Sequence, residues 1–193
     1  MSTNLNAEFW TKRYLDQQTG WDLGTVSPPL KAYIDQLTDR DLRILIPGCG
    51  NAHEGAYLWR EGFKNTHLLD FAEPALVDFS TKNSDFPSNQ LHSGDFFDHI
   101  GEYDLILEQT MFCAIDPSKR NQYAEKCSSL LRKGGKVIGL LFDRVFETGP
   151  PFGGNKTDYE KIFQHYFNKT DISPCYNSIK PRLGSEVFIK LIK

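Results

Sequence analysis

Features that mark several large classes of protein are missing from this chain of 193 residues. No apolar run approaches the ~20 residues that a membrane-spanning helix needs. The polar start, Met1-Ser2-Thr3-Asn4, has no signal-peptide character. Neither sign of charge dominates, because 22 basic residues stand against 25 acidic ones. This balance gives no electrostatic footprint for nucleic acid or anionic membranes, so we expect a cytoplasmic protein that binds neither.

Cysteine is scarce, and its four positions are scattered. Cys49, Cys113, Cys127 and Cys175 form no C-x-x-C pair and show no metal-ligand spacing. We interpret them as reduced thiols and expect no metal site. Repeats and low-complexity tracts are also missing, and 39% apolar content suits one substantial core. The sequence predicts a single, monomeric domain over residues 1–193, with a lid and helix in residues 1–40 and an α/β core in residues 41–193.

The most informative stretch follows a short apolar run from Leu42 to Ile46. That run predicts a buried strand that ends at Pro47, which cannot donate a ladder hydrogen bond. Gly48 and Gly50 come next, and without a Cβ they permit unusual backbone angles and close approach of a ligand. Residues 53–62 predict a helix, and residues 66–69 predict a second strand that ends in Asp70. Asp70 is placed to accept both hydroxyls of a ribose lying over the glycine turn.

This glycine turn departs from the dinucleotide-binding fingerprint. The position of the third glycine is His53, so a nucleoside site without a pyrophosphate contact fits better than a site for NAD or FAD. A glycine turn with a purely structural role remains the alternative.

Large aromatic side chains gather near the N-terminus. Residues 6–18 predict a short helix in which Trp10 and Tyr14 share a face, and Trp21 follows in a loop. Two interpretations stay open. These rings either pack onto the domain, or they form a lid that closes over a cation, because aromatic faces attract sulfonium and ammonium groups.

The rest of the chain alternates helices with strands, which predicts a parallel sheet with helices on both faces. The further predicted helices cover residues 28–37 (with Ser27 as N-cap), 73–83, 117–132 (capped by Asp116) and 157–166. The further strands cover residues 90–93, 103–107, 136–142, 167–173 and 186–192. No helix separates the last two strands, which predicts an antiparallel last strand in a seven-stranded, mostly parallel sheet.

Polar and aromatic residues follow two of these strands. Ligands of open α/β sheets bind at the carboxyl ends of the strands, so we expect Glu108, Gln109 and Phe112 to face the cleft. Asp95 and Phe96 follow the strand at residues 90–93. They offer an acceptor beside an apolar plate, which suits the amino edge and face of a purine.

A long loop over residues 143–155 carries the tip Gly149-Pro150-Pro151-Phe152. A proline pair flanked by glycines can hold an aromatic side chain over a site. Arg144, in the same loop, is a candidate for attracting an anion, although a solvated surface arginine is the alternative.

In this order, these residues resemble a class I S-adenosylmethionine-dependent methyltransferase. More narrowly, the chain resembles the thiopurine methyltransferase family, close to its plant halide/thiol methyltransferase branch. The matching pieces are Trp10-Thr11-Lys12-Arg13-Tyr14, Trp21-Asp22, Pro47-Gly48-Cys49-Gly50, Phe112-Cys113-Ala114-Ile115 and Gly149-Pro150-Pro151-Phe152. The resemblance implies a Rossmann-like, seven-stranded sheet with an N-terminal helical lid.

The resemblance also implies S-adenosylmethionine as the cofactor and assigns residues to it. Trp10, Tyr14 and Trp21 would line the cofactor from the lid. Gly48 and Gly50 would contact its methionine moiety, Asp70 its ribose hydroxyls, and Asp95 with Phe96 its adenine. Cys49, Phe71, Glu108 and Gln109 belong to the same predicted site. The candidates for the substrate pocket are Gln109, Phe112, Arg144 and Phe152.

Gln109 stands where thiopurine methyltransferases carry an arginine and plant relatives a tyrosine. A neutral amide cannot make the charge-assisted contact of an arginine, which disfavours thiopurines. We expect Gln109, Phe112 and Phe152 to form a small chamber opposite Gly48, suited to a small soft nucleophile such as a thiol, hydrosulfide, thiocyanate or halide. No catalytic base is assigned, because thiols are partly ionised near neutral pH and halides need no base.

Two alternatives remain open at this point. One is methylation of another acceptor, such as a thiopurine or an oxygen, nitrogen or metalloid compound. The other is a relative that binds the cofactor without turnover.

Overall fold

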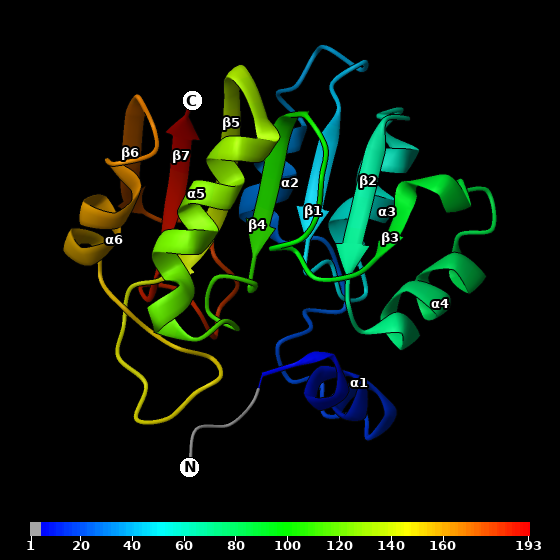
Figure 1. Ribbon diagram of the computed structural model, residues 1–193, viewed down its shortest axis with the longest axis horizontal. Coiled ribbons are helices and arrows are strands. Elements are labelled where there is room, and N and C mark those ends of the chain that lie inside the picture. Colours follow the sequence, from blue (N-terminus) through cyan, green and yellow to red (C-terminus); the bar gives the residue numbers. More distant parts are fainter. Residues whose placement is uncertain (1–4) are drawn as a thin grey trace.

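The computed structural model describes residues 5–193, and residues 1–4 of the predicted lid lie outside the described part. A central sheet carries helices on both faces (Figure 1). Its strands are β1 (Ile44–Pro47), β2 (Thr66–Asp70), β3 (Leu91–Ser93), β4 (Tyr103–Gln109), β5 (Leu131–Phe142), β6 (Lys169–Pro174) and β7 (Glu186–Ile192). The helices are α1 (Ala7–Leu15), α2 (Pro28–Ile34), α3 (His53–Arg60), α4 (Glu73–Lys82), α5 (Arg120–Leu130) and α6 (Lys156–Phe163), with short 3-10 turns at Ser88–Gln90 and Pro117–Lys119.

The strand order is β3-β2-β1-β4-β5-β7-β6, and the predicted seven-stranded sheet is confirmed. Neighbouring strands from β3 to β5 are parallel, whereas β7 pairs antiparallel with both β5 and β6. The last strand is therefore the antiparallel one, as expected. The chain leaves β1 toward β2 and later returns to β4 on the other side, so the strand order reverses at β1. Such a reversal opens a crevice at the carboxyl ends of the strands.

Two apolar clusters hold the layers together, one on each face of the sheet. Tyr123 of α5 and Phe163 of α6 are buried in the first, and Leu30 of α2 and Leu58 of α3 are buried in the second. In Figure 1, α5 and α6 lie in front of the sheet, and α2 and α3 lie behind it. The central strands β1 and β4 are buried on both sides, which is why each was visible as a short apolar run. Within residues 5–193, no helix has both the length and the apolar character needed to cross a membrane.

One strand boundary needs correction, and one predicted helix cap is confirmed in its position only. Strand β5 starts at Leu131, before the double glycine, because Leu131 pairs with Tyr103 of β4. The N–H of Gly134 also donates to the carbonyl of Lys193. Ser27 stands at the N-cap of α2, but in the described structure its side chain makes no capping bond. Instead, the N–H of Ser27 donates to the buried carboxylate of Glu54 over 2.8 Å.

Three histidines form a row on β2, β3 and the loop that follows. Nδ1 of His67 lies 3.0 Å from Nε2 of His92, and the rings of His92 and His99 are 5.1 Å apart. Burial, aided by the neighbouring cation Arg43, lowers the pKa of His67 to about 4. Burial with the neighbouring His92 lowers the pKa of His99 to about 4, and the pKa of His92 is also lowered. The folded protein therefore holds this row neutral.

The histidine row predicts a loss of stability in mild acid. In the unfolded chain these imidazoles have a pKa near 6.5, so between about pH 6.5 and 4 the unfolded state binds more protons than the folded state. The stability they contribute is present above this range and falls as the pH approaches 4. Replacing His99 with Phe should reduce the wild-type loss by about 1 kcal/mol, measured by urea unfolding at pH 7 and 4.5.

The matched control is replacement of His165 with Gln, because this histidine is exposed. The control should follow the wild-type curve. If the His99 variant loses as much stability between the two pH values as the wild type does, the row is not responsible.

Candidate active site

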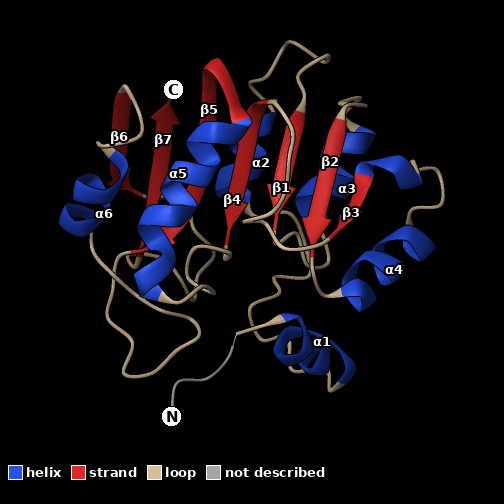
Figure 2. Cartoon of the chain, viewed as in Figure 1, coloured by secondary structure: helices blue, strands red, loops and turns tan. Residues whose placement is uncertain are grey.

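A cavity of about 710 Å³ lies at the carboxyl ends of the strands. Its lining comes from the glycine turn after β1, the end of β2, the turns after β3 and β4, and the end of β5. The N-terminal segment also lines it, and Figure 2 shows α1 below the tips of the parallel strands. Such a cavity at the reversal of strand order is where the topology places a ligand.

The glycine turn is tightly covered. Gly48 and Gly50 have φ angles of +57° and +52°, which favour glycine. A Cβ at Gly48 would lie 3.0 Å from the Cβ of Met111, and one at Gly50 would lie 2.8 Å from the hydroxyl of Tyr14. The turn therefore needs glycine both for its backbone conformation and for the close approach of Tyr14.

Asp70, at the end of β2, is only 6% exposed and lines the cavity. Its Oδ2 accepts from the N–H of Gly50 over 2.9 Å, and its Oδ1 accepts from the N–H of Ala72 over 2.8 Å. Burial raises the pKa of Asp70, and these N–H groups oppose that effect. Each carboxylate oxygen can still accept a further bond, so Asp70 both holds the glycine turn and offers acceptors to a ligand.

The three predicted lid aromatics lie together. The rings of Trp10 and Trp21 meet edge-on at 5.4 Å, and those of Tyr14 and Trp21 meet at 5.7 Å. All three line the cavity. Burial, with a further contribution from the charge of Asp70, raises the pKa of Tyr14, which keeps its hydroxyl neutral. Phe71, Asp95 and Phe96 line the same cavity, and Phe96 is held in place by the ring of Tyr123 at 5.2 Å.

Glu108 and Phe112 do not face the cleft as the sequence predicted. Glu108 is 0% exposed, and its carboxylate accepts from the N–H of Phe112 over 2.9 Å and from the hydroxyl of Tyr123. Burial raises the pKa of Glu108 to about 7. Phe112 packs in the core against the rings of Tyr123 and Tyr159. The expectation that ligands bind at strand ends pointed to the correct turn, the one after β4. Successive side chains of a strand point to opposite faces, however, and Glu108 points into the core, where it accepts from the N–H of Phe112 in that turn.

Gln109 points to a second, smaller cavity of about 50 Å³, which it shares with Gly48, Cys49, Gly50 and Trp21. Its Oε1 atom is buried and has no hydrogen-bond partner among the described residues. The expected chamber of Gln109, Phe112 and Phe152 is therefore not formed. Gln109 instead lies beside the glycine turn.

The loop over residues 143–155 does cover the cavity, but with other residues than Phe152. Arg144, Phe146, Pro150 and Pro151 line the cavity. The backbone of Phe152 is fixed to the turn after β4, because its N–H donates to the carbonyl of Cys113 over 2.7 Å. The buried guanidinium of Arg120 also donates to the carbonyls of Phe152 and Gly153.

The side of the cavity away from Asp70 is apolar and carries two cations. Arg144 stacks over Phe146 at 4.8 Å, and Arg182 lies 5.4 Å from the ring of Phe142. Sequence reasoning missed Met111, Phe142 and Phe146 in this lining. Phe142 could have been found, because it ends a predicted strand. Arg182 lies in a polar turn that gave no signal for its packing against β5.

This fold and this cavity define a class I S-adenosylmethionine-dependent methyltransferase. The chain belongs to the family described as Thiopurine S-methyltransferase, which matches residues 5–185. A probable thiol methyltransferase 2 of Arabidopsis thaliana is 29% identical over 186 residues, which cover 92% of this chain and 81% of the relative. Thiocyanate methyltransferase 1 of Brassica oleracea is 30% identical over 185 residues, with the same coverage.

A solved structure confirms the fold independently. The 1,6-didemethyltoxoflavin-N1-methyltransferase of Burkholderia thailandensis superposes with a TM-score of 0.74 at 14% identity, over 97% of this chain and 86% of that one. That structure contains S-adenosylhomocysteine.

Proposed function

We propose that this protein transfers the methyl group of S-adenosylmethionine to a small, soft, anionic nucleophile, such as a thiolate, hydrosulfide, thiocyanate or halide. One observation carries the proposal: the cavity joins a nucleoside-type site at Asp70 to an apolar wall that carries Arg144 and Arg182. The relatives named for thiol and thiocyanate methylation support the same class of acceptor. Because one cavity must hold the cofactor as well, the room for an acceptor is small.

The residues at the Asp70 end fit the cofactor. Asp70 would accept the two ribose hydroxyls, and Phe71, Asp95 and Phe96 would hold the adenine. Gly48, Cys49 and Gly50 would border the methionine moiety. The unpaired Oε1 of Gln109 lies beside this turn and would accept a bond from the ammonium group of that moiety, which favours a cofactor role for Gln109. Trp10, Tyr14 and Trp21 would face the sulfonium, a contact worth about 0.5–2 kcal/mol.

At the other end, the residues would orient the acceptor and exclude water. The cofactor supplies an activated methyl group when it is bound. Arg144 and Arg182 would attract an anion, and Phe142, Phe146 and the proline pair would strip it of water, which raises its reactivity. Proximity then supplies most of the remaining acceleration.

Neither the thiol of Cys113 nor the buried carboxyl of Glu108 is suited to act as a base or nucleophile at this end. Burial raises the pKa of the Cys113 thiol to about 12, and the Glu108 carboxyl lies in the core outside the cavity. Asp116 also lines the cavity, and the hydrogen bonds from Ser118 lower the pKa of its carboxyl, which makes it a weak base. We therefore expect the acceptor to arrive already ionised. The predicted cytoplasmic location, monomeric state and lack of nucleic-acid partners belong to this proposal as well.

The proposal predicts different pH profiles for two kinds of acceptor. With a small thiol, the rate should rise with pH toward the thiol pKa of about 8.5, because only the thiolate reacts and no base assists it. With iodide, the rate should be nearly flat between about pH 6.5 and 8.5, because iodide does not titrate. Methyl transfer from labelled S-adenosylmethionine, measured at subsaturating acceptor, gives both profiles.

The iodide profile serves as the control for effects of pH on the protein itself. If neither the thiol rate nor the iodide rate changed with pH, an enzyme group would have to remove the proton from the thiol. That result would overturn the conclusion that the site works without a base.

A further inference from the structure

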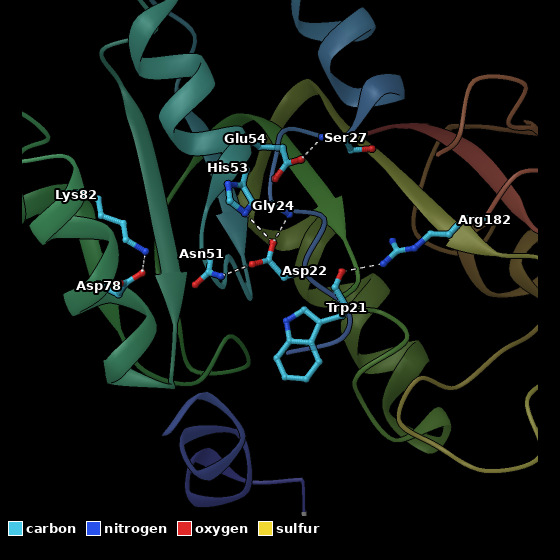
Figure 3. A network of polar contacts seen from close by, with 10 residues as sticks. All are labelled: Trp21, Asp22, Gly24, Ser27, Asn51, His53, Glu54, Asp78, Lys82 and Arg182. Atoms are coloured by element: carbon cyan, nitrogen blue, oxygen red, sulfur yellow. Dashed lines mark hydrogen bonds and ion pairs between the residues drawn. The ribbon is translucent and has the colours of Figure 1, made fainter. Parts of the chain in front are cut away.

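The segment that carries Trp21 is tied to both ends of the cavity, and we call residues 21–27 the strap. Trp21 lines both the large and the small cavity. Figure 3 shows Asp22 turned toward Asn51 and His53 on one side, with Arg182 on the other side of the strap. The strap itself has no helix or strand. Its shape therefore depends on these side-chain contacts.

Asp22 makes the densest set of contacts in the strap. Its Oδ1 accepts from the N–H of Gly24 over 2.9 Å and lies 2.7 Å from Nε2 of His53. Its Oδ2 accepts from the side-chain amide of Asn51 over 2.5 Å. Burial acts to raise the pKa of Asp22, but the bonds from Gly24, Asn51 and His53 outweigh it and lower that pKa. The carboxylate is therefore held charged, with all its donors on the strap or just after the glycine turn.

The two partners of Asp22 outside the strap belong to the cofactor end. Asn51 directly follows Gly50, and His53 begins α3. The contact therefore links the strap to the backbone of the glycine turn. A second link lies further along, where the N–H of Ser27 donates to the carboxylate of Glu54 in α3.

The opposite link runs to the acceptor end. Nη2 of Arg182 donates to the carbonyl of Trp21 over 2.8 Å, and Nη1 lies 3.5 Å from the carboxylate of Glu186. The carbonyl of Trp21 and the N–H of Asp22 belong to one peptide group. The backbone of Trp21 is thus held by Arg182 on one side. On the other side it is held by Asp22, which binds Asn51 and His53.

We propose that Asp22 is a positioning residue, which sets the Trp21 ring over the reacting centre by holding the strap to Asn51 and His53. The inference rests on the proposed function, because it assigns Trp21 a place above the bound cofactor. Asp22 acts through Trp21 and does not itself touch the acceptor. Its removal should therefore weaken cofactor binding and slow transfer even when the protein stays folded.

An exchange of the two side chains at positions 22 and 51 tests this idea. In Asp22→Asn, the charge is lost, but Asn51 can turn its amide oxygen toward the new amide and keep one hydrogen bond. In Asn51→Asp, two carboxylates face each other and the hydrogen bond is lost. When both substitutions are combined, the amide at position 22 can donate to the carboxylate at position 51, while its Oδ1 still accepts from Gly24 and His53. The exchange keeps the net charge and reverses the direction of a single hydrogen bond.

Asn51→Asp should raise the calorimetric Kd for S-adenosylmethionine about tenfold, and Asp22→Asn should raise it about threefold through loss of the charge that faces His53. The double variant should return the Kd of Asn51→Asp to within about threefold of the wild type. The turnover number at saturating cofactor should follow the same pattern. Asp78→Asn is the matched control, since it breaks the exposed Asp78–Lys82 pair on α4, also drawn in Figure 3, and should change neither value.

A merely structural contact would give a different result. Single variants with a lowered melting temperature but wild-type Kd and turnover number would overturn the inference, as would a folded double variant with no recovery. A wild-type protein that binds no S-adenosylmethionine would overturn the proposed function, and this inference with it. Wild-type binding together with unchanged binding in both single variants would overturn the inference alone.

Discussion

Replacement of Asp70 with Ala is expected to weaken the binding of S-adenosylmethionine by about 2–4 kcal/mol, because the two ribose hydroxyls lose a charged acceptor in a buried site. The buried carboxylate lines the cavity, and both of its oxygens are already aligned by the N–H groups of Gly50 and Ala72. A ligand hydroxyl would therefore meet an acceptor that needs no reorganisation. S-adenosylhomocysteine should lose a similar amount, since it contains the same ribose.

The measurement is calorimetric titration with both ligands. Asp70 also supports the glycine turn, so circular dichroism must show that the variant is folded at the titration temperature. Asp78→Ala is a control that removes an exposed carboxylate from the neighbouring helix α4. An unchanged affinity in folded Asp70→Ala would remove Asp70 from the cofactor site.

The second large effect is expected for Gly50→Ala. The φ of +52° costs a side chain about 1 kcal/mol or more, and the new Cβ would lie 2.8 Å from the hydroxyl of Tyr14. Tyr14 would have to move, and with it the packing against Trp21. We expect cofactor affinity to fall at least about tenfold, because the glycine turn and the aromatic lid are both disturbed.

The structure offers a specific rescue for this variant. The next atom of Tyr14 that a Cβ at position 50 would meet is Cζ, at 4.0 Å, which is an ordinary contact. Adding Tyr14→Phe to Gly50→Ala should therefore recover the part of the loss that comes from the clash, whereas Tyr14→Phe alone should have a small effect. A double variant that binds no better than Gly50→Ala would show that backbone strain, and not the position of Tyr14, accounts for the loss.

Most of the fold could be predicted because its signals are local. The central strands β1 and β4 are buried on both faces, several turns carry glycine or proline, and Glu186–Ile192 was predicted with its observed bounds. The errors arose where distant backbone decided the outcome. Strand β5 extends back to Leu131 because Tyr103 and Lys193 pair with this part of the chain. Ser27 is the N-cap as predicted, but the bond from its N–H to Glu54 could not be foreseen, because it joins residues far apart in the sequence.

The candidate site was predictable in part for the same reason. Strand ends pointed to Asp70 and Asp95, and both line the cavity. The strand-end rule does not say on which side a side chain emerges, so Glu108 and Gln109 were both expected in the cleft although they point to different places. Arg182 was named from sequence only as an alternative acceptor contact beside Arg144. Its bond to Trp21 and the bonds of Asp22 could not be predicted, because they join residues far apart in the chain.

The placement of Gln109 also changes how acceptor preference should be explained. Thiopurines were disfavoured because Gln109 was expected in the acceptor pocket, whereas Gln109 lies beside the glycine turn and Arg144 and Arg182 line the large cavity. If thiopurines are accepted, Arg144 or Arg182 would be the contact. The preference for small acceptors now depends on the room left beside the cofactor.

The most direct test compares different acceptors with the same labelled cofactor. Purified protein is incubated with methyl-labelled S-adenosylmethionine and, in turn, with hydrosulfide, a small thiol, thiocyanate, iodide and a thiopurine, and labelled product is quantified for each. The account predicts turnover with at least one small sulfur or halide acceptor, at a higher kcat/KM than with the thiopurine. Faster methylation of the thiopurine than of every small acceptor, or cofactor binding without any methylated product, would contradict it.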